Sequence, residues 1–186
     1  MTLTAGVDDA GRGPVIGPLI LAGVLLESAD LPRLQALGVR DSKLLTPTKR
    51  AGLKPKILDL ALRHQILEFC PAEVDRYVLE GGRLRRLNWL EAKAMAQIIR
   101  ELHPEVAYVD ASDVDASRFG SQIQEMVPFQ LRIISEHHAD RNHPIVAAAS
   151  IVAKVYRDQV VEELRNRFGD FGSGYPSDPR TLYFLE

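Results

Sequence analysis

Two apolar segments joined by a short loop open the chain, and they limit the folds that it can adopt. Residues 3–8 are predicted to form a short strand that ends in carboxylates. Residues 15–26 are rich in Val, Ile and Leu, which predicts a buried strand paired with the first. Residues 10–14 between them are rich in glycine and proline and predict a tight turn. The chain therefore begins with a predicted hairpin inside a sheet.

The later segments alternate between strand and helix patterns. Further strands are predicted at residues 62–69, 106–110 and 130–135. Helices are predicted from Pro47, from Asn88 to about Leu102, and from Pro144 to about Phe168. Pro55 should kink the first of these helices or delay its start. This order favours an α/β domain with a mixed sheet, in which parallel strands are added after the hairpin.

Composition indicates a globular protein and limits its partners. Hydrophobic residues make up 46% of the 186 residues, which supports a single domain over residues 1–186. Because residues 181–186 resemble a helix that the sequence does not finish, we expect the C-terminal portion, about residues 165–186, to be truncated. The 23 Lys and Arg against 25 Asp and Glu give a charge of −2. Bulk positive charge therefore cannot hold nucleic acid, and any such site must be local.

The sequence lacks the features of secreted and membrane proteins. Its longest apolar run, residues 15–26, contains Gly17 and Pro18 and is too short to span a membrane. The N-terminal residues show no signal-peptide pattern. A single cysteine, Cys70, excludes an internal disulfide and a cysteine-based zinc site. We therefore expect a cytoplasmic protein.

Acidic side chains lie where predicted strands end. The aspartates in question are Asp8, Asp9, Asp110 and Asp140. Strand ends and the loops after them converge on one crevice in an open α/β sheet, so these carboxylates are expected to meet. A cation relieves their repulsion, and Mg²⁺ or Mn²⁺ suits oxygen ligands. Two such ions about 4 Å apart support phosphodiester hydrolysis. The competing interpretation is a helix cap or a turn, which we assign to Asp113, Asp115 and Asp178.

The loop Gly11–Arg12–Gly13 follows the paired acids directly. Its glycines allow close approach of the backbone to a ligand, and Arg12 adds a donor for phosphate. A plain β-turn explains the glycines equally well. With Gly17 the loop also gives G-x-G-x-x-x-G, a variant of the dinucleotide-binding pattern. The strand-like, proline-containing sequence after the loop argues against that site, because the dinucleotide pattern requires a helix there.

Other polar residues carry weaker indications. His137, His138 and His143 lack the helical spacing of a zinc site. Two basic clusters lie at residues 49–56 and 83–86. Each either binds the phosphate backbone of a nucleic acid or forms a solvated face. Tyr175 lies in a turn rich in glycine and proline that suits stacking on a sugar or base, and a packing role is the alternative.

Five segments together resemble the type 2 ribonucleases H, the ribonuclease HII family. They follow one another over nearly the whole chain: GVDDAGRGPVIGPL from Gly6, DSKLLTPTKR from Asp41, YVDASD from Tyr108, EHHADRNHPIVAAASIVAKVYRD from Glu136 and GSGYPSDPRT from Gly172. The long GSGYPSDP form is similar to archaeal members.

The resemblance implies a ribonuclease H-like fold: a five-stranded mixed sheet flanked by helices, with a C-terminal helical part. It implies an endonuclease of DNA replication and repair that hydrolyses the RNA strand of RNA/DNA hybrids. Such an enzyme also cuts 5′ of single ribonucleotides in duplex DNA and leaves 3′-hydroxyl and 5′-phosphate ends. Its Mg²⁺ or Mn²⁺ ligands correspond to Asp8, Asp9, Asp110 and Asp140.

Substrate contacts are implied in the same way. Gly11, Arg12 and Gly13 would contact the ribonucleotide 2′-hydroxyl. Tyr175 would contact that hydroxyl and stack on the next deoxyribose, and Lys43 would contact phosphate. The partners are therefore hybrids and ribonucleotide-containing duplexes, without a membrane. We expect a monomer, and a sliding clamp is a conceivable partner, although the C-terminus carries no clamp-binding motif.

One departure from the family pattern concerns the second acid. The family has glutamate where this chain has Asp9, whose side chain is one methylene, about 1.5 Å, shorter. The charge is kept, but the reach toward a metal ion is not. We therefore predict weaker metal binding or a slower reaction, with a preference for Mn²⁺. The alternative is a hybrid-binding module in which catalysis is impaired.

Overall fold

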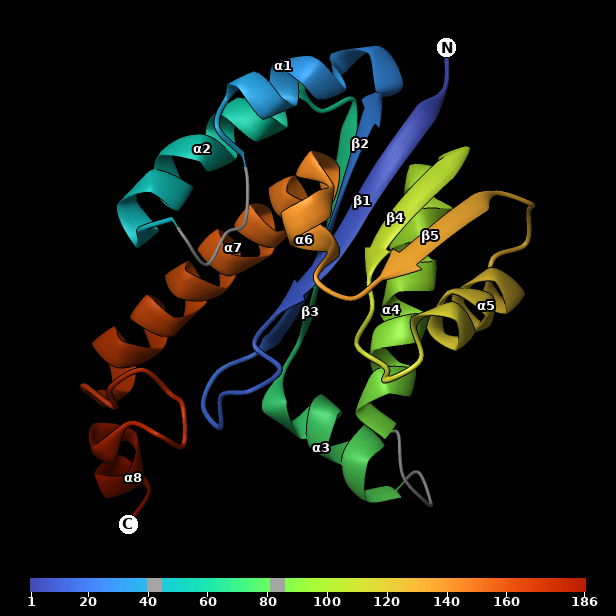
Figure 1. Ribbon diagram of the computed structural model, residues 1–186. Helices are drawn as coiled ribbons and strands as arrows, with labels where there is room; N and C mark the ends of the chain where they lie inside the picture. The colour runs from blue at the N-terminus through green and yellow to red at the C-terminus, as the bar shows by residue number, and fades with distance from the viewer. Residues whose placement is uncertain (40–44, 81–85) are drawn as a thin grey trace.

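A five-stranded mixed sheet forms the centre of the protein (Figure 1). The computed structural model describes residues 1–39, 45–80 and 86–186. The strands are β1 (Leu3–Ala10), β2 (Leu19–Glu27), β3 (Arg63–Phe69), β4 (Val106–Asp110) and β5 (Arg132–Glu136). Their order is β3-β2-β1-β4-β5, antiparallel within β3-β2-β1 and parallel from β1 to β4 and β5. The predicted hairpin and the mixed sheet are confirmed.

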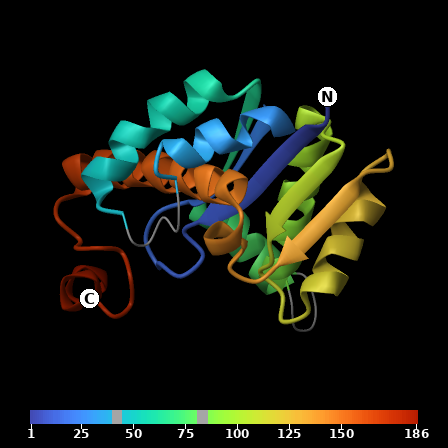
Figure 2. The same ribbon diagram turned by 45° about the horizontal axis from the view of Figure 1, so that its top comes forward.

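Helices cover both faces of this sheet. The helices are η1 (Ser28–Asp30), α1 (Leu31–Ala36), α2 (Pro47–Leu60), α3 (Pro71–Glu80), α4 (Arg86–Leu102), α5 (Ala116–Met126), α6 (Ala139–Asn142), α7 (Pro144–Phe168) and α8 (Pro179–Leu185). Figures 1 and 2 show α7, α1 and α2 on one face and α4 and α5 on the other. None of the described helices is long and apolar enough to cross a membrane.

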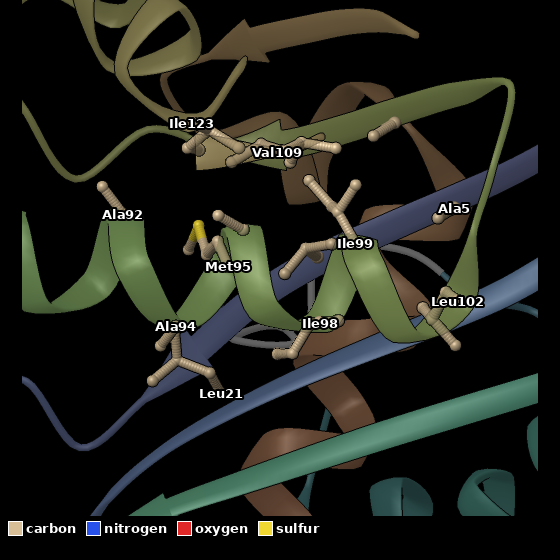
Figure 3. Close-up of a cluster of buried hydrophobic side chains, with 14 of the residues drawn as sticks. Ala5, Leu21, Ala92, Ala94, Met95, Ile98, Ile99, Leu102, Val109 and Ile123 are labelled. Atoms are coloured by element: carbon tan, nitrogen blue, oxygen red, sulfur yellow. The ribbon is translucent and has the colours of Figure 1, made fainter. Parts of the chain in front are cut away.

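Buried side chains from alternate strand positions form two cores. Leu21 belongs to the core between the sheet and α4, together with Met95 and Ile98 of that helix (Figure 3). Its neighbours Ile20 and Ala22 belong to the other core, beneath α7. Because successive strand residues face opposite sides, a central strand covered twice must be apolar throughout. This explains the uninterrupted apolar sequence of β2.

Several predicted boundaries are corrected. The second strand begins at Leu19 rather than residue 15, because Gly17 has φ +98° and Pro18 lacks a donor for the ladder. The first long helix begins at Pro47, where Thr46 accepts from the Lys49 amide, and continues past Pro55 without delay. Asn88 does not cap α4, which already begins at Arg86. Helices α1, α3, α5 and α6 were not predicted.

Helix α7 lies so close to β1 that a glycine is required at their contact. A Cβ on Gly6 would overlap the Ile145 carbonyl and lie 2.7 Å from the Val146 nitrogen. Because backbone cannot move aside, we expect Gly6→Ala to destabilise the fold by about 3 kcal/mol. Gly52→Ala is the control, since the corresponding Cβ in α2 meets nothing within 4 Å. Urea unfolding should show it unchanged or stabilised by up to about 1 kcal/mol. Equal effects at both positions would contradict this packing.

Candidate active site

Two of the predicted acidic residues, Asp8 and Asp110, lie together at the carboxyl ends of neighbouring parallel strands. Val7 of β1 pairs with Val109 of β4, which places Asp8 and Asp110 at neighbouring strand ends. The Asp110 Oδ1 accepts a hydrogen bond of 2.8 Å from the Ala139 amide at the start of α6. This contact ties Asp110 to the turn that carries Asp140. The predicted convergence of strand-end carboxylates is therefore confirmed for Asp8 and Asp110.

Asp9 lies on the opposite face of the sheet from Asp8. Asp9 pairs across the hairpin with Leu21, whose side chain packs beneath α4. Successive residues of a strand alternate, so the Asp8 carboxylate faces α7, where Ser150 hydrogen-bonds it. Among the described residues, no three His, Cys, Asp or Glu side chains are spaced to hold a metal ion in this arrangement. The metal role of the four aspartates stays a prediction.

Negative charge around these strand ends is nevertheless poorly balanced. Burial, and then the charges of Asp9 and Asp110, raise the pKa of Asp8 well above its usual value. Burial, and then Glu91, raise the pKa of Asp9 to about 7. The buried Asp140 Oδ1 has no hydrogen-bond partner within the described parts of the chain. These buried carboxylates repel one another, and one of their oxygens lacks a hydrogen-bond donor. Both features fit the binding of a divalent cation, which reduces the free-energy cost of burying the negative charge.

Glu91 is a site residue that the sequence analysis missed. It is completely buried in α4, and its Oε2 lies 3.4 Å from Nη1 of Arg12. Arg12 also donates from Nη2 to the Asn88 Oδ1 at 2.6 Å and from Nη1 to the Ser112 carbonyl at 2.8 Å. Among 25 acidic residues Glu91 did not stand out. Its position between Leu90 and Ala92, one turn after Asn88, was the available indication.

The buried charge of Glu91 predicts a pH dependence of stability. Burial, which outweighs Arg12, raises the pKa of Glu91 to about 7, above about 4.3 for an unfolded glutamate. The protonated Glu91 therefore contributes fully to the free energy of unfolding below about pH 4, and this contribution is lost as the pH rises to about 7. In chelator, we expect the Tm of Glu91→Gln to fall less between pH 5 and 8 than that of the unmodified protein. The control is Glu101→Gln, at an exposed position, whose Tm should fall as much as that of the unmodified protein. An equally large fall in the Tm of Glu91→Gln would contradict this account.

The glycine loop and Tyr175 lie side by side. The Val15 amide donates to the Gly174 carbonyl at 2.7 Å, and a Cβ on Gly13 would lie 3.3 Å from the Tyr175 ring. Tyr175 is 43% exposed beside the loop. The dinucleotide interpretation is wrong, because strand β2 rather than a helix follows the loop. Lys43 lies outside the described residues.

The other acids and His143 have structural partners. Asp115 and Asp178 cap α5 and α8, and Asp113 accepts from the Asp115 amide at 3.1 Å. His143 Nε2 lies 3.0 Å from the Glu136 Oε2. The assignment of these aspartates to caps and turns is therefore confirmed.

Comparisons with known proteins agree with this geometry. The family model for ribonuclease HII matches residues 5–186. The ribonuclease HII of Thermococcus onnurineus is 45% identical over 98% of this chain and 78% of its own length. The ribonuclease H2 structure from Pyrococcus horikoshii OT3 superposes with a TM-score of 0.90 at 43% identity, covering 98% of this chain and 85% of that one.

A second solved relative is described as the PCNA:RNase HII complex from Archaeoglobus fulgidus. Its TM-score is 0.88 at 43% identity, covering 98% of this chain and 84% of that chain. These relatives are archaeal, as the long GSGYPSDP segment predicts. The family cleaves RNA/DNA hybrids and depends on divalent metal ions. The chain therefore belongs to the ribonuclease HII family of ribonuclease H enzymes.

Proposed function

We propose that this ribonuclease H also cuts 5′ of single ribonucleotides in duplex DNA and leaves 3′-hydroxyl and 5′-phosphate ends. The observation that carries the proposal is that Tyr175 lies beside the Gly11–Gly13 loop, which follows Asp8 and Asp9 at the end of β1. A site that contacts one sugar next to the cleavage position needs only one ribonucleotide. The 2′-hydroxyl is the group that distinguishes RNA from DNA at that position.

Asp8, Asp9, Asp110 and Asp140 would hold the Mg²⁺ or Mn²⁺. When bound, the ion supplies activation of water and stabilisation of the leaving oxygen. Residues of this chain prepare the carboxylates for that role. Ser150 holds Asp8 and in turn accepts from the Lys154 Nζ at 2.6 Å, while the Ala139 amide fixes Asp110. The Asp110 rotamer is therefore set before a metal ion arrives.

In this proposal the backbone of the Gly11–Gly13 loop recognises the ribonucleotide. Three contacts hold the Arg12 guanidinium against α4 and Ser112, so Arg12 fixes the loop. The loop amides and the Tyr175 hydroxyl then contact the 2′-hydroxyl, and the ring stacks on the next deoxyribose. Lys43 remains the proposed phosphate contact. We further propose a cytoplasmic monomer, with a sliding clamp as partner by similarity to the Archaeoglobus fulgidus protein.

The chemistry of the product ends tests this proposal. A DNA duplex with one ribonucleotide should give a single cut on its 5′ side, and a DNA polymerase should extend the upstream product from its 3′-hydroxyl. A four-ribonucleotide stretch and a full hybrid should also be cut. Products that end in a cyclic phosphate and resist extension, or cleavage of an all-DNA control, would contradict it. Binding of the hybrid without cleavage would favour the hybrid-binding module.

A further inference from the structure

The last residue of β5, Glu136, connects the strand end of Asp110 to the turn that carries Asp140. Its backbone belongs to the sheet, where it pairs with Asp110 and its carbonyl accepts a hydrogen bond of 2.9 Å from the Ala111 amide. Its side chain contacts the segment that follows Asp140, because its Oε2 lies 3.0 Å from the His143 Nε2. One residue therefore contacts both of the chain segments that carry these two aspartates.

The C-terminal end of α6 is held through this side chain. The His143 ring lies against the Tyr108 ring of β4, with the ring centroids 4.5 Å apart. The His143 amide donates to the Ala139 carbonyl at 2.8 Å and closes the short helix. Asn142 also donates from Nδ2 to the Glu136 Oε2, at 3.4 Å. The position of this end of α6 therefore depends on Glu136.

The N-terminal end of α6 is fixed to the strand end of β4. The Ala139 amide donates to the Asp110 Oδ1 at 2.8 Å, and His138 before it adopts the left-handed conformation at φ +57°. Asp140 lies between the two anchored ends and is 2% exposed. Its Oδ1 has no hydrogen-bond partner in the described ranges. The backbone of α6, rather than a hydrogen bond to this oxygen, therefore places it.

The contact between Glu136 and His143 is too exposed to contribute much to folding. The side chains are 42% and 25% exposed, and ion pairs at such positions add little to the free energy of unfolding. The hydrogen bond from His143 lowers the pKa of Glu136 against a smaller effect of burial, so the ionised carboxylate accepts this bond. Displacement of a reacting group by about 1 Å can cost 10²-fold in rate. The contact should therefore affect a bound metal ion more than the fold.

We propose that Glu136 is a positioning residue for the divalent ion. It holds the end of α6 through His143 and Asn142, and it thereby fixes Asp140 relative to Asp110. Hydrogen-bond partners around metal ligands typically change metal affinity or activity 10–100-fold when they are replaced. The inference rests on the proposed function for the metal role of the two aspartates. It adds to that function a residue that is not itself assigned as a metal ligand.

Binding of Mn²⁺ without substrate tests this role independently of cleavage. The electron paramagnetic resonance signal of free Mn²⁺ gives the Kd of each variant. Glu136→Ala and His143→Ala should each raise the Kd about 10-fold. The double variant should raise it no further, since both changes remove the same contact. Glu136→Gln keeps an acceptor oxygen and should stay within about 3-fold of the unmodified protein. The control Glu125→Ala, at an exposed position of α5, should bind as the unmodified protein does.

Two results for Glu136 would overturn the positioning role. An unchanged Kd in Glu136→Ala is the first. An equal rise in Glu136→Gln is the second, because it would show that the negative charge attracts the ion without positioning a ligand. Thermal melts in chelator check the fold, and the Tm of Glu136→Ala should fall by less than about 4 °C. A larger fall would make the contact a structural one and would also overturn the proposal.

Asp140→Asn separates this inference from the proposed function. If Asp140→Asn keeps the Mn²⁺ affinity of the unmodified protein, the proposed metal role of Asp140 fails. If Asp140→Asn loses binding while Glu136→Ala keeps it, the positioning role of Glu136 alone fails. An absence of saturable Mn²⁺ binding by the unmodified protein would contradict both.

Discussion

Replacing Asp8 with Asn should lower cleavage of a ribonucleotide-containing duplex about 1000-fold while duplex binding is retained. Asp8 lies at the end of β1 beside Asp110, at the centre of the buried negative charge. An amide removes the charge that attracts a divalent ion, and loss of one such stabilising group costs about 10²–10³ in rate or more. Single-turnover cleavage with Mg²⁺ measures the effect.

Stability should change in the opposite direction. Burial and like charges raise the pKa of Asp8, so its ionised form destabilises the metal-free fold at neutral pH. Asp8→Asn should therefore raise the Tm in chelator at pH 8. Asp115→Asn is the matched control, because asparagine also caps helices and Asp115 only caps α5. Retention of activity within 10-fold by Asp8→Asn would contradict its assigned role.

Replacing Asp9 with the longer glutamate should accelerate the enzyme. Asp9 faces α4 near Glu91, on the side of the sheet opposite Asp8. One more methylene adds about 1.5 Å of reach around the strand end toward Asp8 and Asp110. Because a misplacement of about 1 Å can cost 10²-fold in rate, we expect Asp9→Glu to raise cleavage in Mg²⁺ by about 10-fold or more.

The choice of metal gives a second measurement of the same effect. The ratio of rates in Mn²⁺ and Mg²⁺ should move toward 1 in Asp9→Glu, since better placed ligands depend less on the ion. Asp9→Asn, which keeps the length and loses the charge, should be slower than the unmodified protein in both ions. An unchanged or lower rate for Asp9→Glu would show that reach at this position does not limit the reaction. If Asp9→Glu cleaves the duplex and the unmodified protein does not, the unmodified chain is the impaired hybrid-binding module.

Local sequence was sufficient for the sheet and for the position of the acidic strand ends. The apolar run of β2 indicates a strand covered on both faces, and the carboxylates of β1 and β4 follow directly from where those strands end. The motifs also predicted that the loop and Tyr175 belong together, which the bond from Val15 to Gly174 confirms. Each of these features depends on neighbours in the sequence or on a whole motif.

Features that depend on packing between distant elements were not predictable in this way. The side of the sheet that Asp9 faces depends on the register with Leu21. Arg12 was expected to face substrate, whereas Asn88, Glu91 and Ser112 surround its guanidinium. Asparagine is typical of a helix cap, yet Asn88 lies inside α4 and accepts a hydrogen bond from Arg12 of the glycine loop. In each case a tertiary contact outweighs the local preference.

Metal dependence of cleavage at a single ribonucleotide tests the central claim most directly. The claim is that the carboxylates at the ends of β1 and β4 form the metal-dependent nuclease site. A labelled duplex with one ribonucleotide is incubated with Mg²⁺, Mn²⁺ or chelator, beside an all-DNA duplex and the Asp8→Asn variant. The account predicts one cut, 5′ of the ribonucleotide, with metal only, and almost none with Asp8→Asn. Cleavage in chelator, no cleavage in either metal, or equal cleavage by Asp8→Asn would contradict it.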